Sequence, residues 1–161
     1  MNDVIRTLLY SYPSINEAVE TIDKVILYKA LSSCHDNRKT FQQFNDVIDL
    51  IDYSTRIYEA KCIIDKMLCQ LTEEERQLVE YKFFCKKDKK ANFNPCARVY
   101  FRSQLKLEKK IDEKLAYLNA TEAWFFDEYG DINFLKVNYY VVKKMSKGGG
   151  INSKVLVKVV S

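Results

Sequence analysis

Apolar residues recur at three- and four-residue steps along most of the chain, and polar stretches separate the periodic segments. Residues 15–31 carry one such pattern, which lays an apolar stripe along about five helical turns. A second long pattern covers residues 41–69, and residues 32–40 between the two are polar. Two long amphipathic helices with a connection of ordinary length predict an antiparallel hairpin.

The pattern also places the ends and faces of this hairpin. A short helix over residues 3–10 should stop at Ser11-Tyr12-Pro13, because proline disfavours helical geometry at the residue before it. Ser14 then begins the first long helix, with Glu17 completing a capping box. On the second helix, one face collects Phe44, Val47, Ile48, Ile51, Tyr58, Cys62 and Met67. We expect Ile22 and Ile51 to be buried.

The rest of the chain continues in shorter helices. Thr72 and Glu75 form a second capping box, which begins a helix that ends near residue 85. A further helix begins near Pro95, and its apolar positions are Val99, Tyr100, Leu105, Ile111, Leu115 and Leu118. A short aromatic helix should start at Thr121 or Asn119 and end at Gly130, and we interpret residues 132–145 as helix rather than strand.

The C-terminus differs from everything before it. Three consecutive glycines at 148–150 predict a hinge, and residues 155–160 are the one clear strand candidate. The expected fold class is therefore all-α, with a long antiparallel hairpin, a small helical unit and a short C-terminal strand. The expected divisions are 1–70 (hairpin), 71–118 (basic helical unit), 119–147 (aromatic helices) and 148–161 (hinge and tail), with 1–147 forming one compact domain.

Composition supports a folded helical chain. The 161 residues are 47% hydrophobic and 30% charged, which is typical of folded proteins. Only 4 Gly and 2 Pro occur, too few for the frequent turns of a β-sandwich or barrel. No segment has the length of a membrane span or the layout of a secretory signal, so we expect a cytoplasmic protein without membrane contact.

Candidate catalytic and metal-binding residues are few. Five cysteines without a CxxC pair, and a single histidine, fit reduced packed thiols better than a disulfide framework or a zinc site. Cys34, His35 and Asp36 are neighbours in a loop, an arrangement that rarely places a base and its orienting group on opposite sides of one imidazole. No phosphate-binding glycine motif occurs. We expect no catalytic site, no metal and no cofactor.

Positive charge is concentrated in the middle of the chain. Residues 82–110 contain ten basic and two acidic residues, a net charge of +8, whereas the whole chain carries +4. The remaining residues therefore sum to −4. A basic centre in an acidic remainder predicts a localised surface for a polyanion such as duplex DNA, although a solvated lysine-rich helix face gives the same pattern. The candidate nucleic-acid-binding residues are Lys86, Lys87, Lys89, Lys90, Arg98, Tyr100, Arg102, Ser103, Lys106 and Lys109.

Two segments of this region resemble a known family. LTEEERQLVEYKFF (71–84) followed by ARVYFRSQLKLEKKI (97–111) is similar to the C-terminal promoter-reading region of sigma factors (region 4) and to phage ArpU-like transcription regulators. The resemblance implies a helix-turn-helix in which residues 98–109 lie on the recognition helix, with Arg98 and Arg102 matching its basic positions best. The intervening CKKDKKANFN has almost no apolar positions, so the positioning helix is expected to be degenerate.

Two functional hypotheses follow. The first is a transcription-regulator-like protein of phage or mobile-element origin that contacts duplex DNA through the basic helix. The alternative is a non-enzymatic interaction module in which the hairpin and the aromatic region bind RNA polymerase or a second copy of the chain.

Overall fold

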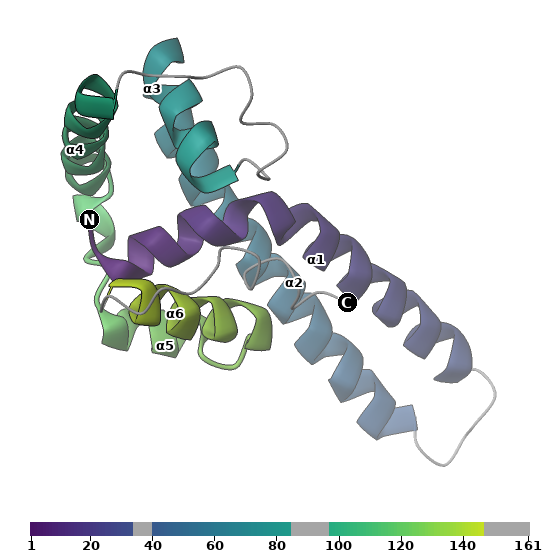
Figure 1. Cartoon of the computed structure of the whole chain (residues 1–161). Helices are drawn as coiled ribbons and strands as arrows, with labels where there is room; N and C mark the ends of the chain where they lie inside the picture. Colours follow the sequence, from purple (N-terminus) through teal and green to yellow (C-terminus); the bar gives the residue numbers. More distant parts are fainter. Residues whose placement is uncertain (34–39, 85–96, 147–161) are drawn as a thin grey trace.

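The computed structural model of the chain describes residues 1–33, 40–84 and 97–146 (Figure 1). The elements are α1 (Asp3–Ser33), α2 (Thr40–Cys69), α3 (Glu73–Val79), the π-helix η1 (Glu80–Phe84), α4 (Ala97–Lys114), the 3-10 turn η3 (Ala116–Leu118), α5 (Glu122–Tyr129) and α6 (Asn133–Ser146). These ranges contain helices and turns and no strand, which confirms the predicted helical fold class for them. Pro95, the glycine hinge and the candidate strand lie outside them.

The break that the sequence predicts near Pro13 is wrong, because α1 runs through residues 3–33 as one helix. Ser14 is accordingly an interior residue and not an N-cap. Tertiary contacts hold this segment helical: Ser11 is fully buried and its Oγ accepts a hydrogen bond of 2.9 Å from Asn138 Nδ2. Figure 1 shows that α1 changes direction part-way along its length, as expected for a helix that loses one backbone hydrogen bond to an interior proline.

Helices α1 and α2 lie side by side and run antiparallel (Figure 1). The Tyr12 hydroxyl donates to Asp65 Oδ1 at 2.5 Å near one end of the pair, and Lys29 Nζ lies 2.7 Å from Asp46 Oδ2 near the other. The two long helices therefore pack against each other along most of their length. Helix α6 and η1 pack against α1 as well.

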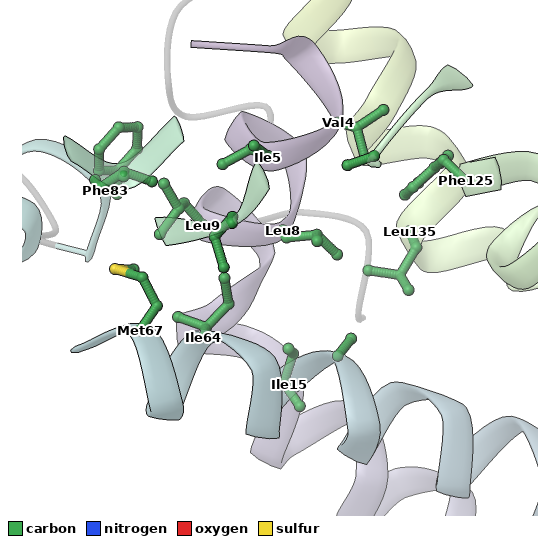
Figure 2. Close-up of a cluster of buried hydrophobic side chains, with 14 of the residues drawn as sticks. Val4, Ile5, Leu8, Leu9, Ile15, Ile64, Met67, Phe83, Phe125 and Leu135 are labelled. Atoms are coloured by element: carbon green, nitrogen blue, oxygen red, sulfur yellow. The ribbon is translucent and has the colours of Figure 1, made fainter. Parts of the chain in front are cut away.

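The core is built around the first turns of α1. Leu8 and Leu9 are completely buried, and Figure 2 shows Leu9 pointing toward Ile64, Met67 and Phe83, which belong to α2 and η1. Leu8 faces the side on which Leu135 of α6 lies (Figure 2). The cluster combines side chains from most of the described helices, so the first turns of α1 act as the common packing partner of helices far apart in sequence.

The buried face of α2 is not the one that the pattern favoured. Ile57, Ala60, Ile64 and Met67 face the core, whereas Ile51 is 49% exposed. Of the expected face, Phe44, Ile48 and Tyr58 are exposed too, and Met67 alone is fully buried. The expected burial of Ile51 is therefore wrong, and Ile22 is half-buried against the edge of the core. The reason is that α2 carries two apolar faces and only one meets other helices.

The shorter helices begin where their capping residues predict. Thr72 Oγ1 accepts from the Glu75 backbone amide at 3.3 Å, and the Glu75 carboxylate accepts from the Thr72 amide at 2.9 Å, which confirms this capping box. Thr121 caps α5 and Gly130 follows its last residue. Residues 133–146 form a helix, as expected. None of the described helices has the length and low charge needed to cross a membrane.

Candidate nucleic-acid interface

Helix α4 contains the six candidate residues that the structure describes. Its last turns are fixed to the protein by Leu107 and Ile111, together with Leu115 directly after the helix; the three are spaced four residues apart and are all buried. This spacing places the three side chains on one face of the helix. Two other expected apolar positions, Val99 and Leu105, are exposed instead, because they lie on faces that no other described element covers. In Figure 1, α4 lies at the opposite end of the molecule from the last turns of α1 and the first turns of α2.

An ion pair joins α4 to the N-terminus of α3. Lys110 Nζ lies 2.6 Å from both oxygens of the Glu75 carboxylate, the same group that caps α3 through Thr72. The Lys110 ammonium and, next to it, the hydrogen bond from the Thr72 amide lower the pKa of Glu75. Lys110 therefore helps to hold α4 against α3, and the Glu75 carboxylate balances its positive charge within the protein.

A second cluster of charges joins α4 to η1 and α1. Glu108 forms an ion pair with Lys82 and lies 3.5 Å from the Arg6 guanidinium. Burial by itself would raise the pKa of the Glu108 carboxyl, but the hydrogen bond from Lys82 and the two nearby cations outweigh it and lower the pKa. Two of the ten basic residues in the range 82–110, Lys82 and Lys110, thus have carboxylate partners.

Four other cations of α4 form an exposed stripe, which we term the basic stripe: Arg98, Arg102, Lys106 and Lys109. Steps of four, four and three residues place them on one face. Lys109 lies two residues from both Leu107 and Ile111, a rotation of about 200° about the helix axis, so the stripe faces away from the core. None of the four forms an ion pair with the parts of the chain that the structure describes.

The remaining candidates occupy different surroundings. Tyr100 is half-buried, and its ring meets Tyr81 edge-on at a centroid distance of 5.4 Å. Its hydroxyl accepts a hydrogen bond from Gln104, and burial raises its pKa. Ser103 is half-buried on the flank of the helix. Tyr100 therefore packs within the protein instead of extending the basic stripe. The four lysines at 86, 87, 89 and 90 lie outside the described residues.

Apolar side chains next to the basic stripe are the part of this surface that sequence reasoning missed. Val99, Phe101 and Leu105 are all exposed on the same helix. Leu105 and Phe101 lie one position before Lys106 and Arg102, so they border the stripe on one side. Their spacing of four residues was visible in the sequence, but it is also the spacing of a core face.

Thiol and metal chemistry have little geometric basis in the described residues. Cys62 is half-buried and Cys69 is exposed, and both are free thiols. Within residues 1–33, 40–84 and 97–146, no three His, Cys, Asp or Glu side chains come together as metal ligands would. The sequence Cys34-His35-Asp36 and the cysteines at 85 and 96 lie outside these ranges.

Comparisons with known proteins add no family assignment. A scan against protein-family models, a search of curated proteins and a search of solved structures each found no match to the chain.

Proposed function

We propose that the chain is a transcription-regulator-like protein that contacts duplex DNA through the basic stripe of α4. One observation supports this proposal most: four cations, Arg98, Arg102, Lys106 and Lys109, share an exposed helix face that points away from the core. Their neighbours Lys82 and Lys110 are neutralised by carboxylates. The helix thus separates cations that attach it to the protein from cations available to a polyanion.

The dimensions of the stripe suit a phosphate backbone. From residue 98 to residue 109 the helix rises about 16 Å. Over that length one strand of B-DNA carries about five phosphates. Guanidinium and ammonium groups along a helix can therefore contact several phosphates at once, which supplies affinity and orientation without sequence selection.

The resemblance to sigma region 4 and to ArpU-like regulators refines the proposal. In that arrangement α3 with η1 precedes a helix-turn-helix whose recognition helix is α4, and Arg98 and Arg102 read or clamp the groove. One face of the first turns of α4 is exposed, with Arg98 and Arg102 on it, while Tyr100 on another face meets Tyr81 of η1. A recognition helix needs such an exposed face near its N-terminus to contact bases in a major groove.

A salt titration of binding to random-sequence duplex tests the proposal. Each neutralised phosphate contributes about −0.9 to the slope of log K against log salt, so the four cations of the stripe should give a slope of about −3.6. Arg98→Ala with Arg102→Ala should halve that slope approximately and weaken binding at low salt. The helix should stay folded, because both side chains are exposed.

The matched control removes the same charge elsewhere. Lys24 and Lys66 are exposed on α1 and α2, and neither has an ion pair among the described residues. Lys24→Ala with Lys66→Ala should change affinity and slope far less. If both double variants reduce the slope equally, binding follows net charge and the proposed contact surface is wrong.

A protein partner is the second candidate for this helix. Exposed Val99, Phe101 and Leu105 beside the stripe favour it, because apolar side chains rimmed by charge are typical of protein interfaces. On this alternative, the Arg98→Ala/Arg102→Ala variant binds duplex as well as the parent does. A pull-down with RNA polymerase would then lose its signal on Phe101→Ser with Leu105→Ser.

A further inference from the structure

Helix α2 carries an apolar stripe that the core does not use. It consists of Phe41 (79% exposed), Phe44 (61%), Ile48 (48%), Ile51 (49%) and Tyr58 (54%), and exposed Thr55 completes its spacing. We term these six residues the α2 seam. Successive members are separated by three, four, three, four and three residues. That alternation is the heptad spacing of the contact positions in a coiled coil.

The seam and the core face are distinct surfaces of one helix. The core face consists of Ile57, Ala60, Ile64 and Met67, all buried. Tyr58 follows Ile57 by one residue, a rotation of about 100°, so the seam lies on the flank of α2 next to the core face and is exposed to solvent. It extends over about 26 Å of helix, long enough for a two-stranded coiled-coil contact.

The area of the seam matches what a dimer requires. Large aromatic side chains bury about 150 to 250 Å² each, so the exposed fractions above leave on the order of 500 to 600 Å² on the seam of one copy. This is at the upper end of the largest apolar patch found on ordinary monomers, about 300 to 600 Å². Two seams together bury about 1,000 Å² or more, the size at which specific interfaces begin.

The seam is also complementary to itself when a second copy runs in the opposite direction. In one antiparallel register Phe41 meets Tyr58 of the second copy, Phe44 meets Thr55, and Ile48 meets Ile51. All six positions are then used, and a two-fold axis passes between Ile48 and Ile51. Two exposed carboxylates, Asp52 and Glu59, each follow a seam residue; in this register Asp52 approaches the uncharged Asn45 of the second copy and so meets no like charge.

The position of the seam fits this arrangement. The other helices lie toward one end of the α1–α2 pair (Figure 1), so an antiparallel contact puts the two bodies at opposite ends of the dimer. We propose that the chain forms an antiparallel homodimer through the α2 seam. The contact leaves the basic stripe free, because α4 lies at the far end of each copy, and it stands independently of DNA binding.

The oligomeric state of the full chain at several concentrations tests the dimer. Sedimentation velocity should show a dimer that dissociates on dilution, and Ile48→Asp with Ile51→Asp should raise the dissociation constant on the order of 100-fold or more. The control is Leu27→Asp with Leu31→Asp, which makes the same change at exposed apolar residues of α1 outside the seam. It should remain dimeric.

Circular dichroism separates loss of the dimer from loss of the fold. Phe41→Asp gives a second variant at the most exposed seam residue and should also yield a folded monomer. A parent that is monomeric at every concentration overturns the proposal. So does a folded seam variant that dimerises like the parent, or a control that dissociates as readily as the seam variant.

A charge pair tests the orientation. Phe41→Lys or Tyr58→Glu alone should weaken the dimer, because each buries a charge without a partner. Combined in one chain, the two changes bring the introduced ammonium of one copy beside the introduced carboxylate of the other only in the antiparallel register. The double variant should therefore dimerise more tightly than either single variant. A double variant weaker than both singles indicates a parallel contact and contradicts the proposed register.

Discussion

The two halves of the α1–α2 pair share a helical spacing of apolar residues but have different surroundings. In the proximal half, residues 3–18 and 57–69, the apolar positions are mostly buried by η1, α4, α5 and α6. In the distal half, residues 19–33 and 40–56, the two helices pack mainly on each other. Arg56, at the boundary with the proximal half, pairs with Asp131, but large apolar side chains farther along, such as Tyr28 and Phe44, are exposed. Helical periodicity therefore indicates where the apolar faces of a helix lie, whereas the burial of each face depends on which other elements pack against it.

The largest expected effect comes from comparing one apolar position in each half. Leu8→Ala should lower the free energy of unfolding by about 2 to 5 kcal/mol, because Leu8 is fully buried and its truncation leaves a cavity. Ile51→Ala should cost less than about 1 kcal/mol in the monomer, since half of its side chain is already in water. Denaturant unfolding at low protein concentration measures both. Equal losses would mean that the distal half is covered in solution.

The sequence predicts local structure well where a signal is local. Thr72 and Glu75 begin α3 as expected, but the same signature at Ser14 and Glu17 lies inside α1. The difference comes from a long-range contact, the buried hydrogen bond of Ser11 with Asn138, 127 residues away. No local pattern contains that information.

The choice of face on α2 failed for a related reason. The spacing of Phe44, Ile48 and Ile51 is as regular as that of Ile57 and Ile64, so the pattern cannot tell a core face from an exposed seam. Only the positions of the other helices decide between them.

The candidate site was predicted in part. The alignment of the basic residues of α4 on one exposed face follows from helical spacing alone. The pairing of Lys110 with Glu75, 35 residues away, and the contact of Tyr100 with Tyr81 depend on how the helices pack. The sequence therefore predicts the basic stripe, but it does not show that Lys110 and Tyr100 are engaged in contacts within the protein.

An intermediate effect is expected in the proximal half, where charges are also packed. Glu108→Gln should destabilise the protein by about 1 to 3 kcal/mol at neutral pH, because it weakens hydrogen bonds to the Lys82 and Arg6 cations. The folded-state pKa of Glu108 is lowered from its ordinary 4.5, so its contribution is present above pH 4.5 and is lost as the pH falls through the folded value. The difference in melting temperature between parent and variant should shrink accordingly below pH 4.5.

The control for this acid effect is Glu74→Gln. Glu74 is exposed and has no ion pair with the described residues. Its variant should melt within a degree or so of the parent at every pH, as surface substitutions usually do. The prediction is contradicted if the difference in melting temperature between the Glu108 variant and the parent stays constant down to about pH 3. Glu108 would then contribute through packing and not through the charge of its carboxylate.

The smallest effect is expected for the ion pair that joins the distal halves of α1 and α2. Lys29 Nζ and Asp46 Oδ2 are 2.7 Å apart, but both side chains are more than a third exposed to solvent. Exposed pairs of this kind contribute at most about 1 kcal/mol and are screened by salt. In a double-mutant cycle of Lys29→Met and Asp46→Asn, the coupling energy should therefore be below about 1 kcal/mol and should decrease in high salt. A larger coupling that salt does not change would show that the distal pair is shielded from water, as it would be if another chain covered this half of the molecule.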